Sequence, residues 1–195
     1  MSSSESFFSE IPAAPAEPEW DPMSQPEWLR VPHEVAPVTV GATAVVASND
    51  RFAIVVGPLA VYDRGLLLDL TLIRNPWSET ADDRKLILGQ IGPHNDADGF
   101  RSGIRWADGR TARSDRRHID VDEGRNASMV NWGGGGSNDA SRTEWWVWPL
   151  PDRGDLELIT QFPAGGIPET AYVLDGDAIR AAAKAAQPIW TAPPT

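Results

Sequence analysis

Short runs of apolar and β-branched residues, separated by turn residues, extend along the chain from Val38 to Leu174. Runs of this length and spacing are typical of an antiparallel β-sandwich or barrel. In the second run the pair Gly57-Pro58 interrupts the alternation as a bulge or bend would. The pattern predicts strands over 38–47, 52–62, 66–74, 103–107, 110–113, 143–148, 156–162 and 171–174.

The third run has the clearest pattern. Leucines occupy positions 66, 68, 70 and 72, whereas Asp69 and Thr71 lie among the intervening residues. Since side chains alternate between the two faces of a strand, one face is purely apolar and the other is mixed. The turn residues Asp63 to Gly65 precede this run, so the sequence predicts a hairpin with the preceding strand.

Two other patterns predict a second hairpin and a central strand. Asp108-Gly109 separates two short runs and predicts a second hairpin with a type I′ turn, because this dipeptide tolerates positive φ angles. The run Thr143 to Trp148 carries bulky side chains on both faces, Trp146 and Trp148 on one and Trp145 and Val147 on the other. A strand with two apolar faces is expected at the centre of a sheet.

The segment 133–139 begins with four consecutive glycines and continues with Ser, Asn and Asp. It offers no side chains for packing, so it is predicted to be a mobile loop.

The last element is predicted to be a helix over about 176–187. Asp175 is a good N-cap, Asp177 complements the positive end of the helix dipole, and Pro188 prevents continuation. Ile189 and Trp190 are then expected to pack against the domain. Together these elements predict an all-β protein: an Ig-like or related β-sandwich of about seven to nine strands with one C-terminal α-helix, over residues 37–195.

Residues 1–36 differ in composition from the rest. They contain seven carboxylates against one arginine, together with six prolines. Such a segment buries too little apolar surface to offset the entropy of ordering it, so it is predicted to be a disordered, acidic, Pro-rich arm. A Pro-Glu-Trp motif occurs twice in the arm and contains Trp20 and Trp28. These tryptophans either cover an exposed edge of the chain's own sheet or dock to a protein partner.

Charge and composition exclude several classes of function. The formal net charge of −11 opposes binding to nucleic acid or to an anionic membrane surface, so neither is expected as a partner. The chain has no cysteine, which removes disulfides, thiolate metal sites and cysteine nucleophiles. The first residues have no signal-peptide pattern and no run is long enough to span a membrane, so a cytoplasmic location is predicted.

One polar pattern, His-x-Asp-x-Asp, occurs twice. In an extended chain its three side chains project from the same side, so each copy offers an imidazole and two carboxylates to a divalent cation such as Mn²⁺, Mg²⁺ or Zn²⁺. The alternative is that these residues are ordinary turn residues of an acidic protein. The candidate metal ligands are His94, Asp96, Asp98, His118, Asp120 and Asp122.

Evidence for catalysis is weaker. There is no Gly-x-Ser-x-Gly nucleophile motif, and the glycine run lacks the Lys-Ser/Thr of a phosphate-binding loop. The nine tryptophans suggest glycan stacking as another alternative, but a sandwich core is the ordinary place for this residue.

Three segments resemble a group of actinobacterial β-sandwich proteins for which no activity is established. They begin at Trp145 (WWVWPLP), Gly166 (GIPET) and Leu174 (LDGDAI). The resemblance implies the fold and a bacterial host, and no functional residues. The sequence thus favours a non-catalytic protein-interaction or structural module of the bacterial cytosol, with no catalytic or cofactor-binding residues; the alternative is a metal-binding or small-ligand-binding sandwich, which includes a metal-dependent enzyme or a glycan-binding module.

Overall fold

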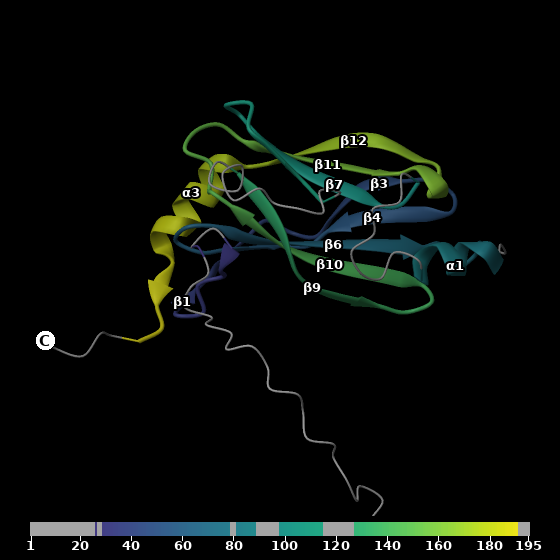
Figure 1. Cartoon of the computed structure of the whole chain (residues 1–195), viewed down its shortest axis with the longest axis horizontal. Coiled ribbons are helices and arrows are strands. Elements are labelled where there is room, and N and C mark those ends of the chain that lie inside the picture. Colours follow the sequence, from purple (N-terminus) through teal and green to yellow (C-terminus); the bar gives the residue numbers. More distant parts are fainter. Residues whose placement is uncertain (1–25, 27–28, 79–80, 89–97, 115–126, 191–195) are drawn as a thin grey trace, which may run out of the picture.

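The structure is a computed structural model in which two β-sheets pack face to face (Figure 1). It describes residues 26, 29–78, 81–88, 98–114 and 127–190. No helix in these residues is long and apolar enough to cross a membrane.

The larger sheet has seven antiparallel strands. Five of its strands pair in the order β2-β5-β6-β10-β9. The other two extend from β6, because β4 pairs with the C-terminal half of β6 and β3 pairs with β4. The strands are β2 (Val38–Val40), β3 (Ala44–Ser48), β4 (Phe52–Val56), β5 (Leu59–Val61), β6 (Leu66–Arg74), β9 (Ser128–Gly136) and β10 (Ala140–Trp148).

The smaller sheet has four strands in the order β12-β11-β7-β8. They are β7 (Arg101–Trp106), β8 (Thr111–Arg113), β11 (Leu156–Phe162) and β12 (Ile167–Leu174). In the described residues the remaining elements are a two-stranded sheet, two α-helices and one 3₁₀ turn: β1 (Val35–Ala36), β13 (Gln187–Pro188), α1 (Ala81–Leu88), α3 (Gly176–Ala185) and η3 (Pro163–Gly165).

The core lies between the inward faces of the two sheets. Leu68 and Leu70 of the larger sheet belong to the same buried cluster as Ile104 and Leu158 of the smaller one, and each is at most 1% exposed. Burial of these alternating apolar residues is the main favourable contribution to folding. The prediction of an all-β sandwich with a C-terminal helix is confirmed.

The hairpin before Leu66 is also confirmed. The amide of Tyr62 donates to the carbonyl of Gly65 at 2.8 Å and closes the turn between β5 and β6. Along β6 the four leucines at even positions are buried, while the intervening residues are less buried. The bounds of β6 agree with the alternation in the sequence because every second side chain enters the core.

The structure divides two of the eight predicted strands and adds β1, β9 and β13, which were not predicted, so the described residues form thirteen strands. Gly41, with φ +78°, separates β2 from β3. Gly57 and Pro58 separate β4 from β5, where a Cβ at position 57 would lie 3.3 Å from the Cβ of Asp69. These breaks let β4 and β5 pair with different halves of the long strand β6.

The turn between β7 and β8 differs from its prediction. The amide of Gly109 donates to the carbonyl of Trp106, and the amide of Trp106 donates to the carbonyl of Arg110. Only Gly109 of this loop has positive φ, at +90°, whereas a type I′ turn needs positive φ at both central residues. The type I′ prediction is therefore wrong, and the hairpin has the three-residue loop in which glycine ends the turn.

The predicted mobile loop at 133–139 is largely wrong. Gly133 to Gly136 form the second half of β9 and pair with Ser141 to Glu144 of β10. The ladder uses backbone N–H and C=O groups, which glycine possesses in full, so the missing side chains do not prevent pairing. Only Ser137 to Asp139 form the turn, closed by a bond of 2.8 Å from the Ser137 amide to the Ala140 carbonyl.

The C-terminal helix is confirmed, but the prediction for the residues after it is wrong. Asp175 caps α3 by accepting from the amide of Ala178 at 2.9 Å. Ile189 and Trp190 do not pack into the core and are 50% and 69% exposed. The backbone holds this end instead, since the Ile189 amide donates to the Glu34 carbonyl at 2.8 Å.

The packed part of the chain begins before residue 37. Val31 and Val35 are 1% and 7% exposed and pack with Tyr62 and Trp146 on the outer face of the larger sheet. The rings of Tyr62 and Trp146 meet edge to face with centroids 5.7 Å apart. Residues 29–36 therefore form part of the folded domain and cover Trp146, which explains how β10 buries bulky residues on both faces.

Candidate functional site

The free edge of β9 is the first candidate site. β9 is the last strand of its path in the larger sheet, paired with β10 on one side and with no described strand on the other (Figure 1). An unpaired edge presents a row of backbone donors and acceptors, which proteins usually protect with charged residues, proline or a covering segment. From Asn131 to Gly136 this edge has neither a charge nor a proline.

The glycines of this edge are only partly explained by the chain's own packing. A Cβ at Gly134 would lie 2.6 Å from the carbonyl oxygen of Arg142, so this residue must be glycine. A Cβ at Gly135 would have no atom within 4 Å, and at Gly133 it would make an ordinary contact with Glu144. Neither has a positive φ. Glycine in a strand lowers stability by about 0.5 to 1 kcal/mol relative to alanine. At positions 133 and 135 this loss is not explained by a need to avoid a steric clash.

A hollow of about 480 Å³ lies beside the glycines on the outer face of the sheet. Thr71 and Arg142 line it, with Glu144 and the glycines 134–136. Arg142 donates from Nε to Asp69 Oδ2 and from Nη2 to Glu144 Oε1, each at 2.7 Å. The hydrogen bond that Arg142 donates to Asp69 raises the pKa of Arg142 above its ordinary value, so this guanidinium stays charged.

Trp132 lies at the other end of the glycine run and is 39% exposed. The ring of His33 lies against it, with centroids 5.5 Å apart and planes tilted by 44°. The edge therefore combines a half-exposed indole with a stretch of bare backbone. Gly in a strand often marks a place where another backbone approaches closely.

Most residues selected from the sequence lie outside the described part of the chain. This holds for Trp20 and Trp28 of the arm and for five metal candidates: His94, Asp96, His118, Asp120 and Asp122. Asp98 is described and exposed, and its backbone carbonyl accepts from the amide of Ala164 at 2.9 Å. Within the described residues, no three His, Asp or Glu side chains are grouped to hold a metal ion. Metal binding by the two motifs stays a prediction.

Sequence analysis missed the β9 edge because it treated the glycines as a loop. A signal was present: the residues before them, Ser128 to Trp132, are mostly apolar, and a Ser-Asn-Asp turn follows them. Turn residues after a run of any composition mark the point where a hairpin reverses.

No protein-family model, no curated protein and no solved structure matches this chain. The resemblance to actinobacterial β-sandwich proteins is therefore still a prediction.

Proposed function

We propose that this protein is a non-catalytic interaction module of the bacterial cytosol that binds an extended segment of a partner protein by adding it as a strand to the edge of β9. The free glycine edge of Asn131 to Gly136 is the observation that carries the proposal. Strand addition obtains its affinity from backbone hydrogen bonds and its specificity from pockets for alternate side chains.

The edge fits this mode in two ways. Gly133 and Gly135 have no side chains, so these two positions add neither bulk nor charge to the edge that an incoming backbone would approach. The neighbouring hollow provides the specificity, because its Arg142 and Glu144 side chains can bond with a polar side chain of the added segment. The half-exposed Trp132 supplies an apolar contact at one end. Aromatic residues of this kind dominate the energetics of many interfaces.

Two other occupants of the edge have distinct consequences. A second copy of the chain would pair β9 with β9 and produce a dimer, the commonest symmetric assembly. The chain's own Pro-Glu-Trp arm, with Trp20 and Trp28, would occupy the edge from within. Occupation by a second copy predicts a dimeric mass. Occupation by the arm predicts that removing residues 1–28, which contain both Pro-Glu-Trp motifs, strengthens peptide binding.

The test selects binders from a display library of random peptides about ten residues long, a length that spans one strand. Selected peptides are expected to slow hydrogen exchange of the outward amides between Asn131 and Gly136. The variant Gly135→Lys places a charge on the edge at a position where a Cβ would meet no atom within 4 Å, and it should weaken the binding of these peptides by about tenfold or more.

Val173→Lys is the matched control, because Val173 is 58% exposed on a strand of the other sheet. It adds the same charge and should leave binding unchanged. Peptides that bind both variants equally, or that leave the exchange of residues 131–136 unaltered, would show that the proposed site is wrong. So would a dimer that Gly135→Lys dissociates, since the occupant would then be a second copy.

A further inference from the structure

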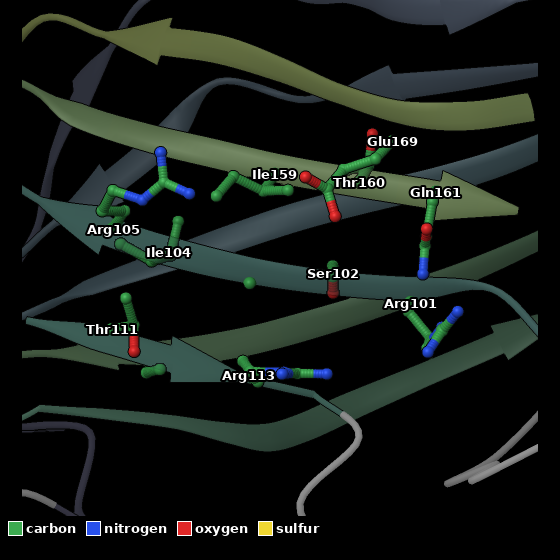
Figure 2. Close-up of a pocket in the computed structure, with 12 residues that line it drawn as sticks. Arg101, Ser102, Ile104, Arg105, Thr111, Arg113, Ile159, Thr160, Gln161 and Glu169 are labelled. Carbon is green, nitrogen blue, oxygen red and sulfur yellow. The ribbon is translucent and has the colours of Figure 1, made fainter. Parts of the chain in front are cut away.

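The outer face of the smaller sheet carries a hollow of about 240 Å³ centred on Gly103 (Figure 2). It lies on a different sheet from the β9 edge. Gly103 is paired with Arg113 of β8 on one side and with Ile159 of β11 on the other. A Cβ at position 103 would lie 2.9 Å from the carbonyl oxygen of Ala112. The close approach of β8 therefore requires glycine here, and the absent side chain leaves the hollow.

Arginines surround this hollow on three sides. Arg101 and Arg105 flank Gly103 along β7 and project from the same face, since alternate residues of a strand share a face. Arg113 projects from the neighbouring strand. Figure 2 shows Arg105 at one end of the hollow and Arg101 with Gln161 at the other, while Arg113 lies on the neighbouring strand between the two ends and extends toward the Arg101 end. In a chain with formal net charge −11, this is a local concentration of positive charge.

Different side chains accompany the arginines at the two ends of the hollow. At one end Arg105 donates to Glu157 at 2.8 Å, so its charge is largely balanced. At the other end Arg101 lies opposite Gln161 in the β7–β11 ladder. Arg101, Arg113 and Gln161 each take part in other contacts as well. A guanidinium has five N–H donors, so an anion can share these groups without displacing every existing partner.

From this geometry we infer that the Gly103 hollow binds a compact organic carboxylate, with its carboxyl group between Arg101 and Arg113 and its apolar part over Ile159. The planar forks of arginine match a carboxylate with two parallel hydrogen bonds. Glu169 also lines the hollow, and Ile159 offers the apolar part of a carboxylate a contact that inorganic phosphate cannot use. The volume lies below the range of about 300 to 1,000 Å³ usual for drug-sized ligands, so the ligand is small.

Succinate and inorganic phosphate are the probes, each titrated at constant ionic strength into the full chain. Binding is followed by the backbone amide resonances of residues 101–105 and 111–113. Succinate is expected to shift these resonances in a saturable way. The double variant Arg101→Gln with Arg113→Gln should weaken succinate by about tenfold or more, as expected for charge-assisted hydrogen bonds.

Arg84→Gln on α1 is the control, since it removes one exposed positive charge outside the hollow and should leave the titration unchanged. If succinate shifts none of these resonances, or binds the double variant and the control equally, the site is not formed. Tighter binding of phosphate than of succinate would overturn the assignment to a carboxylate. Gly135→Lys lies on the other sheet and should not affect succinate binding. The carboxylate site and the β9 edge are therefore tested independently, and either proposal can fail without the other.

Discussion

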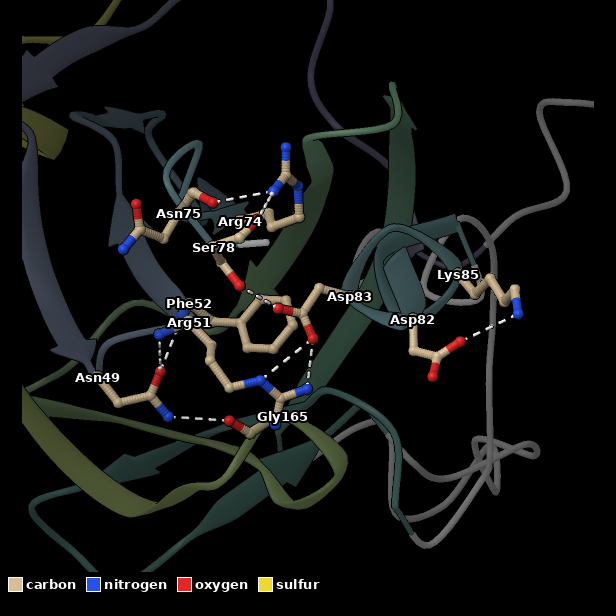
Figure 3. A network of polar contacts seen from close by, with 10 residues as sticks. All are labelled: Asn49, Arg51, Phe52, Arg74, Asn75, Ser78, Asp82, Asp83, Lys85 and Gly165. Atoms are coloured by element: carbon tan, nitrogen blue, oxygen red, sulfur yellow. Dashed lines mark hydrogen bonds and ion pairs between the residues drawn. The ribbon is translucent and has the colours of Figure 1, made fainter. Parts of the chain in front are cut away.

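Arg51 holds the buried carboxylate of Asp83 by two hydrogen bonds, one from Nε at 3.1 Å and one from Nη2 at 2.5 Å (Figure 3). The Oγ of Ser78 donates to the second carboxylate oxygen at 2.6 Å. Asp83 is 0% exposed and lies in the first turn of α1, so this pair attaches the helix to the loop before β4. Ile87, one turn later, is also fully buried, and packs with Phe52 and Phe162.

The Arg51–Asp83 pair predicts a pH dependence of stability. The hydrogen bond from Arg51 is the largest cause that lowers the pKa of Asp83 below its ordinary value. Because the folded-state pKa lies below the unfolded-state pKa, the stabilisation is complete above the unfolded value and is lost as the pH falls through the folded value. The free energy of unfolding, measured by urea denaturation, should therefore decrease below about pH 4.

Asp83→Asn tests this assignment. The variant should be less stable at pH 7 by about 2 kcal/mol, because it replaces charge-assisted hydrogen bonds with neutral ones. It should also have a smaller loss of stability between neutral and acidic pH. Asp82→Asn is the matched control, since Asp82 lies on the same helix turn and forms an exposed ion pair with Lys85. Equal pH profiles for the two variants would contradict the role given to Asp83.

Two glycines of the larger sheet predict opposite effects of alanine. A Cβ at Gly65 would collide with the buried ring of Trp146 and lie 2.8 Å from the carbonyl oxygen of Val147. Gly65→Ala should therefore destabilise the protein by about 2 to 3 kcal/mol, as overpacking of a core does. Gly135→Ala meets no atom and should be neutral or stabilising by up to about 1 kcal/mol. Urea denaturation of both variants checks the contrast, and a loss of stability in Gly135→Ala would mean that this glycine has a structural role.

These glycines show where sequence reasoning succeeds and where it fails. The alternation of Leu66 to Leu72 is a local pattern that reports directly on burial, so the bounds of β6 could be predicted. The role of Gly133 to Gly136 could not, because it depends on the partner strand that the chain brings beside them. Pairing uses backbone groups, which leave no trace in side-chain composition.

The candidate sites could not be predicted from the sequence for the same reason: they depend on which strands pair. Gly103 appears in the sequence as an ordinary strand residue, and its hollow exists only because Arg113 and Ile159 are placed on either side of it by strand pairing. The exposure of Trp190 could not be predicted either. Its hydrophobicity favours burial, but Trp190 follows β13, which pairs with β1 outside the two main sheets, and it is 69% exposed there.

The N-cap of α3 gives a prediction for a single hydrogen bond. Asp175 accepts from the amide of Ala178 at 2.9 Å and satisfies one of the unpaired donors at the start of the helix. Asp175→Ala should lower the free energy of unfolding by about 1 kcal/mol, and Asp175→Ser should recover most of it. If alanine and serine at this position give equal stability by urea denaturation, the cap does not contribute.

The hydrogen bonds of the Arg74 guanidinium are expected to hold the turn between β9 and β10 in place. This side chain is 5% exposed and donates from Nε to Asp139 at 3.0 Å and from Nη1 to the carbonyls of Asn75 and Ser78, also at 3.0 Å. Lysine offers three donors from a single nitrogen and cannot reach these separated acceptors together. Arg74→Lys should therefore destabilise the protein by about 2 kcal/mol, because a buried cation would lose several of its hydrogen bonds.

The same substitution should loosen the hairpin between β9 and β10, since Asp139 belongs to its turn. Hydrogen exchange of the Ser137 amide, which bonds to the Ala140 carbonyl, is expected to become faster. Arg105→Lys is the control, because Arg105 and Glu157 are half-exposed and such pairs contribute less than about 1 kcal/mol. If Arg74→Lys leaves the exchange of Ser137 unchanged while lowering global stability, Arg74 supports the core without positioning the turn. Faster exchange at Ser137 together with weaker peptide binding would instead link the buried fork to the shape of the β9 edge.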